Sequence, residues 1–155
     1  MSVLEKVCSK LNEEKIPYAI VGGFAVALHG AIRGTIDIDL ITKLTLKNFV
    51  AFEKAMLELG LESRLPVTAK EVFNFREEYI KNRNLIAWSF FNPKKPIEVI
   101  DVIITEDLTG MKTIDKNLRN QKIKVLSLPD LISMKEKSGR PQDLEDVKTL
   151  KELLK

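Results

Sequence analysis

The stretch Tyr18-Ala-Ile-Val-Gly-Gly-Phe24, followed after a short interval by Arg33-Gly-Thr-Ile-Asp-Ile-Asp-Leu-Ile41, decides the fold of this chain. The apolar residues after Tyr18 are typical of a buried strand, and the glycine pair predicts a tight turn. The run that begins at Phe24 favours a helix, and the residues before Ile41 alternate as a strand does. The stretch therefore predicts a strand over 18–21, a helix over 23–30 and a strand over 35–41.

The glycine pair Gly22-Gly23 has the properties of a phosphate-binding turn. Glycine has no Cβ, so a phosphate can approach the backbone closely, and the N–H groups at the start of a helix attract an anion. A glycine pair after a strand is also a common plain turn, and both interpretations stand at this point. The chain has no Gly-Lys-Ser/Thr and no G-x-G-x-x-G, which excludes a P-loop and a dinucleotide fingerprint.

Asp37 and Asp39 lie two residues apart in an alternating stretch. In a strand, both carboxylates point to one face and the apolar residues between and around them point to the other. Two carboxylates on one face repel each other, and a divalent cation relieves that repulsion. Oxygen ligands suit Mg²⁺ or Mn²⁺, and Mg²⁺ is usually held by one or two carboxylates with phosphate oxygens of a substrate. The other interpretation is a solvated polar face of an edge strand.

A third carboxylate, Asp101, lies within the most strand-like run of the chain, Pro96–Ile104. A charge among buried aliphatic residues needs a partner or a metal. If this strand lies beside the strand of Asp37 and Asp39, the three carboxylates form a triad. Residues 85–91 predict a strand, 92–96 a turn and 97–104 the returning strand of a hairpin.

Two segments of the chain resemble the minimal nucleotidyltransferases of the polymerase-β-type superfamily, above all small prokaryotic members that occur as toxin-like subunits of toxin–antitoxin pairs. The first is Val21-Gly-Gly, Leu28-His29-Gly30 and Arg33-x-Thr35-x-Asp37-x-Asp39-Leu40, and the second is Leu128-Pro-Asp-Leu-Ile-Ser-Met-Lys135 with Arg140-Pro-Gln-Asp143-Leu-Glu-Asp146. The resemblance implies an α+β fold, with a mixed β-sheet flanked by helices and further helices at the C-terminal end. It also implies transfer of a nucleoside monophosphate from a nucleoside triphosphate to an acceptor, with loss of pyrophosphate.

The resemblance assigns roles to particular residues. Asp37, Asp39 and Asp101 are the implied catalytic residues and ligands of Mg²⁺ or Mn²⁺, and Asp101 is the candidate general base. Many relatives have Gly-Ser where this chain has Gly22-Gly23, so the serine hydroxyl is absent here and backbone groups would bind the phosphate. The candidates for contact with the nucleotide are Gly22, Gly23, Arg33, Thr35, Lys135 and Arg140.

Several of these roles have a second interpretation. Arg33 either contacts the triphosphate or forms an ion pair within its loop. Lys135 is either a substrate contact or a solvated helix lysine. Asp143 and Asp146, three residues apart, could simply neutralise the start of the last helix. His29, the only histidine, is expected to be structural.

Two other functions are compatible with the same residues. One is a nucleotide-binding module that has lost catalysis and acts as a regulator or partner. The other is a metal-dependent phosphohydrolase or nuclease, which the shortage of histidines disfavours. For a transferase, the resemblance implies a protein, RNA (a tRNA end) or a small molecule as acceptor, and an antitoxin or HEPN-type protein as partner.

Length and composition predict one domain over residues 1–155, with 45% hydrophobic and 30% charged residues. No run approaches the ~18 apolar residues that span a membrane, and the N-terminus lacks a signal-peptide pattern. We therefore expect a cytoplasmic protein that does not enter the membrane. The single cysteine, Cys8, falls on the apolar face of a predicted helix and is expected in the core.

The formal net charge is +3, and the basic residues are unevenly distributed. Asp115 is the only acid in a short region with five basic residues, namely Lys112, Lys116, Arg119, Lys122 and Lys124. This region is either a solvated surface or a site for a polyanion such as RNA. The remaining patterns predict helices over 2–15, 45–59, 106–119, 128–137 and 141–154, a short helix from Thr68, and a strand over 122–127.

Overall fold

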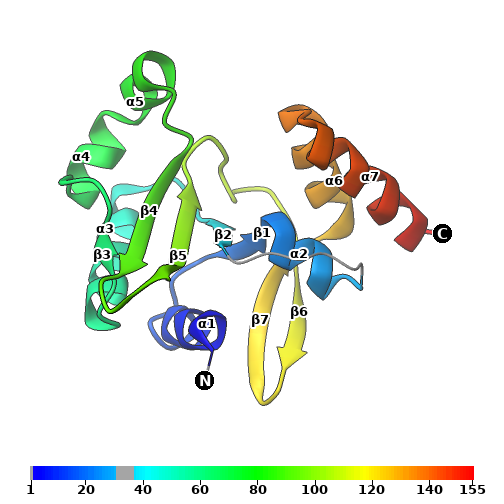
Figure 1. Cartoon of the computed structure of the whole chain (residues 1–155), viewed down its shortest axis with the longest axis horizontal. Coiled ribbons are helices and arrows are strands. Elements are labelled where there is room, and N and C mark those ends of the chain that lie inside the picture. The colour runs from blue at the N-terminus through cyan, green and yellow to red at the C-terminus, as the bar shows by residue number, and fades with distance from the viewer. Residues whose placement is uncertain (1, 31–36) are drawn as a thin grey trace.

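The computed structural model describes residues 2–30 and 37–155, and its framework is a mixed β-sheet (Figure 1). The strands are β1 (Ala19–Val21), β2 (Ile38–Ile41), β3 (Glu62–Ser63), β4 (Ala87–Asn92), β5 (Lys95–Ile103), β6 (Thr113–Leu118) and β7 (Gln121–Leu126). The helices are α1 (Val3–Glu13), α2 (Gly22–Leu28), α3 (Leu46–Glu58), α4 (Ala69–Asn74), α5 (Arg76–Arg83), α6 (Leu128–Ser138) and α7 (Pro141–Leu153). The predicted α+β class, with helices around a mixed sheet and at the C-terminal end, is confirmed.

The sheet has the strand order β3-β4-β5-β2-β1-β7-β6. β1 pairs with β2 in antiparallel fashion, and β2 pairs with β5 in parallel, with Asp39 opposite Asp101. The strand of Asp101 therefore lies directly beside the strand of Asp39, as the sequence predicts. β4 and β5 form the predicted antiparallel hairpin, in which Ser89 is the partner of Asp101.

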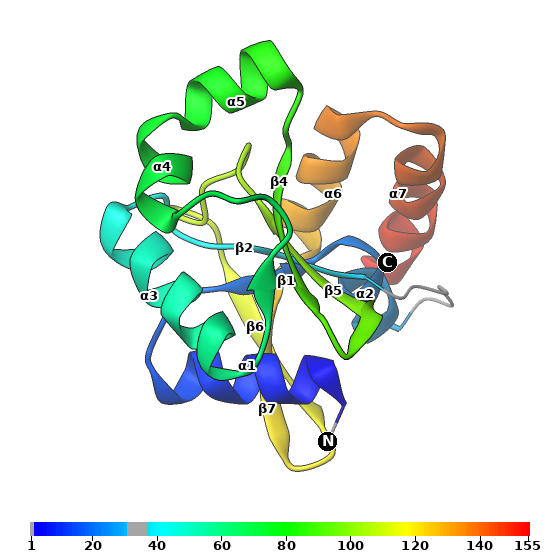
Figure 2. The same cartoon turned by 60° about the vertical axis from the view of Figure 1, so that its left-hand side comes forward.

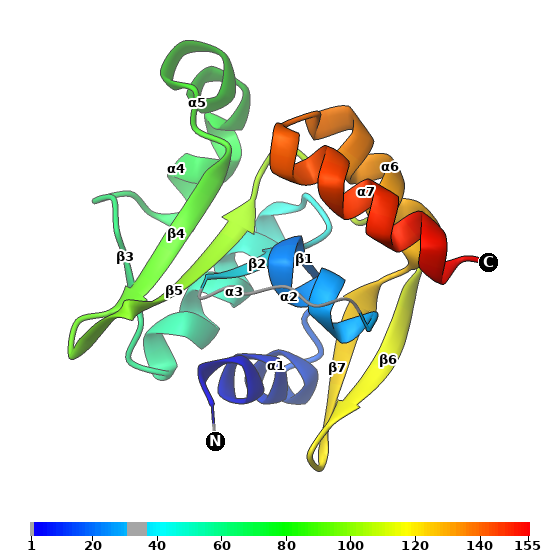
Figure 3. The same cartoon turned by 45° about the vertical axis from the view of Figure 1, so that its right-hand side comes forward.

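Helices cover both faces of this sheet. α3 and α2 lie on opposite faces, and α1 contacts α3 (Figures 2 and 3). α6 and α7 pack against each other beside the end of the sheet where β1 leads into α2 (Figure 1). The C-terminal helix pair therefore reaches the end of the central strands at which Gly22 lies.

Local side-chain signals set most helix starts. Thr45 and Ser127 cap α3 and α6 through their hydroxyl groups, and Thr68 caps α4 in a capping box with Glu71. α7 begins at Pro141, where the missing N–H of proline costs no helical hydrogen bond. These capping residues explain why the helix predictions near them hold.

The core lies between α3 and the sheet. Phe49 and Phe52 of α3 pack on Trp88 and Phe90 of β4, with ring centroids 5.7–6.3 Å apart. Cys8 is fully buried, which confirms its place in the core, and burial raises the pKa of its thiol to about 12. The apolar faces of the predicted helices are therefore the packing faces.

The predicted helix over 106–119 is wrong. Residues 113–118 form strand β6, which pairs along its whole length with β7 in an antiparallel hairpin. β6 is an edge strand rich in charged and polar residues, so it has no alternating apolar pattern, and its pairing with β7 determines the conformation. Helix α5 was missed for a related reason, since it buries none of its side chains.

The predicted strand over 35–41 is observed as β2 from Ile38, while positions 35 and 36 lie outside the described residues, as do Arg33 and Thr35 of the predicted site. Within residues 2–30 and 37–155, none of the helices is both long enough and apolar enough to cross a membrane.

Candidate active site

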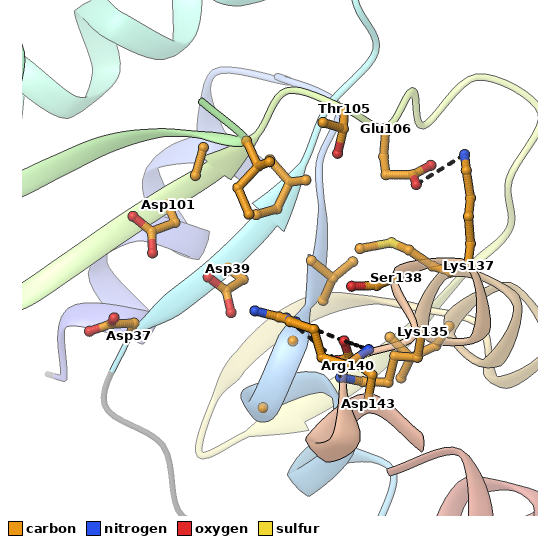
Figure 4. A pocket seen from close by; sticks show the side chains of 18 residues that line it. Asp37, Asp39, Asp101, Thr105, Glu106, Lys135, Lys137, Ser138, Arg140 and Asp143 are labelled. Carbon is orange, nitrogen blue, oxygen red and sulfur yellow. Dashed lines mark hydrogen bonds and ion pairs between the residues drawn. The ribbon is translucent and has the colours of Figure 1, made fainter. Parts of the chain in front are cut away.

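One cleft of about 1020 Å³ brings together most of the predicted site residues (Figure 4). It lies between the sheet and the helix pair α6–α7. Asp37, Asp39 and Asp101 line it from the sheet side, Gly22 and Gly23 from the start of α2, and Lys135 and Arg140 from the C-terminal helices. Residues more than 100 positions apart in the sequence therefore face one space.

Gly22 is required by its contact with Asp39. A Cβ built on Gly22 would lie 2.9 Å from Cβ and Cγ of Asp39 and closer still to its Oδ2, and the backbone there has φ +65°. Any other residue would push the carboxylate aside and strain the backbone. The glycine thus allows β1 and β2 to hold Asp39 at the base of the cleft, in addition to any contact with phosphate.

The three carboxylates differ in exposure. Asp37 is exposed just before β2, whereas Asp39 and Asp101 are half-buried on adjacent strands. Burial raises the pKa of Asp39 to about 7, and the negative charges of Asp101 and Asp37 add to this increase, against the opposing charge of Lys135. The sheet side of the cleft therefore holds negative charge that the surrounding residues compensate only in part.

Ser89 orients Asp101. Its hydroxyl donates a hydrogen bond of 2.5 Å to Oδ1 of Asp101 from the opposite position on β4. A bond to one oxygen fixes the plane of the carboxylate and directs its other oxygen. The sequence gives one weak signal for this role, a single polar residue in the apolar run of β4, and our prediction did not include it.

A divalent cation fits this donor set in part. Among the residues that the structure describes, no three His, Cys, Asp or Glu side chains converge closely enough to form a ready-made metal cluster. Asp39 and Asp101 still form a carboxylate pair of the kind that holds Mg²⁺ together with substrate phosphates, and Asp37 lines the same cleft. Repulsion by Asp101 and Asp37 adds to the raised pKa of Asp39, and a bound cation would counter this repulsion.

Lys135 is held in a buried ion cluster. Its Nζ lies 2.9 Å from Oδ2 of Asp146 and 3.4 Å from Oδ1 of Asp143, and all three side chains are at most 7% exposed. Lys135 is therefore not a solvated helix lysine. Asp143 and Asp146 do more than neutralise the start of α7, because they join α7 to α6 through this lysine.

Arg140 extends from the same cluster toward the carboxylates on the sheet side of the cleft. Its Nε donates a 2.8 Å hydrogen bond to Oδ2 of Asp143, while the side chain stays 70% exposed. Figure 4 shows the guanidinium directed toward Asp39, whose charge contributes to the raised pKa of Arg140 after the hydrogen bond and charge of Asp143. Arg140 is thus an exposed cation that faces the carboxylates on the sheet side of the cleft.

The rest of the cleft is mainly apolar. Glu106 and Lys137 form a 3.3 Å ion pair that joins the segment after β5 to α6 at its rim (Figure 4). Sequence reasoning assigned no site role to Glu106, Lys137 or the apolar residues here, and so missed this surface. Its apolar residues are Ile86, Ala87, Ile103, Leu131 and Met134.

His29 has a structural contact, in line with expectation. Its Nε2 lies 2.8 Å from the carbonyl oxygen of Leu126. A carbonyl oxygen only accepts, so Nε2 carries the proton and donates. Burial lowers the pKa of the imidazole, and the hydrogen bond attaches the end of α2 to β7.

No protein-family model matches the sequence, and no curated protein matches it. Solved structures do match. The antibiotic-resistance factor ANT(2″)-Ia shares 13% identity at a TM-score of 0.64, over 97% of this chain and 81% of its own. A candidate nucleotidyltransferase of Thermotoga maritima shares 19% identity at 0.62, over 98% and 90%. An antigenic nucleotidyltransferase-like protein of Paracoccidioides brasiliensis shares 18% at 0.60, over 96% and 73%. At these identities the likeness shows a common fold.

Proposed function

We propose that this protein is a metal-dependent nucleotidyltransferase, which transfers a nucleoside monophosphate from a nucleoside triphosphate to an acceptor hydroxyl and releases pyrophosphate. The observation that carries the proposal is the pairing of Asp39 with Asp101 on adjacent strands, in a cleft that also contains Gly22 and the exposed Arg140. The fold supports it, since one neighbour was solved with adenylyl-2″-tobramycin and another is a lincosamide antibiotic adenylyltransferase.

In this proposal, Asp39 and Asp101 would hold Mg²⁺ or Mn²⁺ with Asp37 as a third ligand, and the cation would supply charge neutralisation for the phosphates. Asp101 accepts the proton of the acceptor hydroxyl, and Ser89 keeps its carboxylate in the required orientation. The acceptor oxygen then bonds to the α-phosphorus while the bond to the pyrophosphate oxygen breaks.

Arg140 is placed to bind the negative charge of the leaving pyrophosphate, because its guanidinium is exposed in the cleft. Lys135 adds positive potential from behind Arg140, but its ammonium group is already bound to two carboxylates. The backbone at Gly22 and Gly23 is the proposed contact for the phosphates. Arg33 and Thr35 belong to the proposal through the sequence resemblance alone.

The apolar part of the cleft suits a flat or apolar portion of the substrates, either the nucleobase or the acceptor. The acceptor itself, whether a protein, an RNA or a small molecule, is left open in this proposal. A toxin-like role with an antitoxin or HEPN-type partner is supported only by the sequence resemblance.

A second function has one specific observation in its favour. The absence of a ready-made metal cluster among the described residues, together with Gly23 in place of serine, suits a nucleotide-binding module that has lost catalysis. Such a module would gain thermal stability from a nucleotide without releasing pyrophosphate.

The test measures pyrophosphate release from each of the four α-³²P-labelled nucleoside triphosphates with Mg²⁺, in the presence of candidate acceptors. Asp39→Asn and Asp101→Asn should each lower the rate at least about 1,000-fold, since each removes a ligand charge. Glu13→Gln, an exposed carboxylate on α1, is the matched control and should leave the rate unchanged. Equal label transfer by Asp39→Asn and the parent would falsify the metal-assisted assignment, and nucleotide binding without any transfer would favour the module.

A further inference from the structure

A second hollow of about 970 Å³ lies at the other end of β1 and β2 from the candidate active site. Tyr18 precedes β1 and Lys43 follows β2, whereas Gly22 and Asp39 lie toward the opposite ends of these strands. The end of α1, the segment 108–113 and the β6–β7 hairpin complete its walls; α1 and β7 lie side by side in Figures 1 and 3. We call this hollow the lysine groove, after Lys15, Lys43, Lys122 and Lys124 in its lining.

The lysine groove contains the charge excess of the whole chain. Its lining has four lysines and one acid, Asp115, an excess of three positive charges. The complete chain has 25 basic and 22 acidic residues, which is also an excess of three. The remainder of the protein is therefore neutral overall, and its positive potential is concentrated in this groove.

The four lysines of the groove are not used for internal ion pairs. Within residues 2–30 and 37–155, none of them lies within ion-pair distance of an acid, although Asp115 is opposite Lys124 in the hairpin register. Neighbouring cations differ. Lys10 lies 3.3 Å from both Glu14 and Glu58, and Arg119 lies 3.3 Å from Glu5. Lys10 and Arg119, just outside the groove, are thus paired with acids, while the four lysines inside it are available to a ligand.

The lining also indicates the class of ligand. The aliphatic residues Leu11, Ile16 and Leu108 are at most 6% exposed, so the apolar side chains accessible in the groove are those of the half-buried Pro17 and Met111. Tyr18 is 1% exposed and offers no ring for stacking of bases. Ammonium groups with polar side chains around them, but without an aromatic platform, suit contact with the phosphate backbone of a nucleic acid and not with its bases.

We propose that the lysine groove binds the phosphate backbone of a nucleic acid independently of base sequence. The five basic residues that cluster in the sequence are divided by the fold. Of these, Lys122 and Lys124 line the groove, whereas Arg119 pairs with Glu5. The other two lysines of the groove, Lys15 and Lys43, lie far from this basic cluster in the sequence. The groove is thus a tertiary feature, not the basic run itself.

The test uses the full-length protein and a fluorescein-labelled 20-nucleotide RNA, with binding measured by anisotropy at several salt concentrations. The reaction contains no nucleoside triphosphate, so the outcome is independent of the proposed transfer activity. Four phosphate contacts predict a slope of log K against log salt of about −3 for a single strand. Replacing Lys15, Lys43, Lys122 and Lys124 by Gln should weaken binding at low salt at least about tenfold and flatten this slope.

The matched control replaces Lys54, Lys70, Lys81 and Lys94 by Gln, which removes the same charge from exposed positions outside the groove. It should change the affinity less than about threefold. Equal weakening by both sets, or no binding of RNA by the parent, overturns the proposal. Competition by polyglutamate as effective as by unlabelled RNA of equal charge also overturns it, in favour of an acidic protein partner. Equal melting temperatures of both variants and the parent show that each set is folded.

Discussion

Asp39 and Asp143 line opposite sides of one cleft with the same side chain, but their surroundings move the pKa in opposite directions. Burial and two neighbouring carboxylates raise the pKa of Asp39 to about 7. Burial also raises the pKa of Asp143, but hydrogen bonds from Arg140 and Ser138 and the charges of Arg140 and Lys135 outweigh it and lower the pKa to about 2. The sheet side keeps negative charge available for a ligand, whereas the helix side uses its charges to hold α6 and α7 together.

The largest effect is expected when the ion cluster on the helix side of the cleft is broken, which should lower the free energy of unfolding. Lys135→Met leaves Asp143 and Asp146 buried without their shared cation, and removal of one member of a buried ion cluster costs about 3 kcal/mol. Urea denaturation should show this loss in the free energy of unfolding. The exposed Lys148→Met on α7 is the control, since its contact with Glu145 is a surface ion pair. Equal stability of both variants would mean that the cluster does not join the helices.

A smaller effect is expected from the orientation of Asp101 on the sheet side. Ser89→Ala removes the 2.5 Å hydrogen bond and should lower kcat about tenfold with little change in KM for the nucleotide. Ser89→Thr keeps the hydroxyl and should restore most of the rate. The Mg²⁺ concentration for half-maximal rate should rise in the alanine variant alone. A loss of rate that threonine does not rescue would point to packing of β4 instead.

The charge of Asp39, which its surroundings balance only in part, predicts that Asp39→Asn is less active but more stable than the parent. A carboxyl whose pKa is raised on folding destabilises the fold as pH rises from about 4 to about 7. Without metal, Asp39→Asn should therefore melt a few degrees above the parent at pH 8, and the difference should shrink toward pH 4. Mg²⁺ should raise the melting temperature of the parent but not that of the variant. A lower melting temperature for the variant at pH 8 would contradict the electrostatic account.

The smallest effect concerns Asp143, whose pKa is shifted in the opposite direction from that of Asp39. Its contribution to stability is complete above about pH 4 and is lost as pH falls toward about 2. We expect about 1 kcal/mol, because Arg140 is largely solvent-exposed and its ion pair is screened. Asp143→Asn should flatten the decline in unfolding free energy over this window. The acid decline should persist unchanged in Asp115→Asn, an exposed control.

Elements that are determined by short-range sequence signals, such as turns, helix caps and apolar strands, could be predicted from the sequence. The strand, glycine turn and helix around Gly22, the caps at Thr45 and Ser127, and the strand of Asp101 were all predictable, because short-range chemistry determines them. The cost of a buried charge predicted a partner or a metal for Asp101, and the structure places its strand beside that of Asp39.

Features that depend on contacts between distant segments were not predictable. β6 has no apolar alternation, and only its pairing with β7 makes it a strand. Ser89 is one polar residue in an apolar run, and its role appears only when Asp101 lies opposite. The motif contains Lys135, Asp143 and Asp146, but their buried ion pairs could not be read from it because they depend on the packing of α7 on α6.

The contact between Gly22 and Asp39 has a consequence for descent. Every other amino acid carries a Cβ, so a change at position 22 would displace the carboxylate while Asp39 is present. Asp39 could change alone, because Gly22 has no Cβ to clash with a side chain at position 39. In a lineage that abandoned the reaction but kept the fold, loss of the aspartate should therefore precede loss of the glycine. Loss of the glycine would then be the later of the two changes, and a sequence with Asp39 but without Gly22 should be rare.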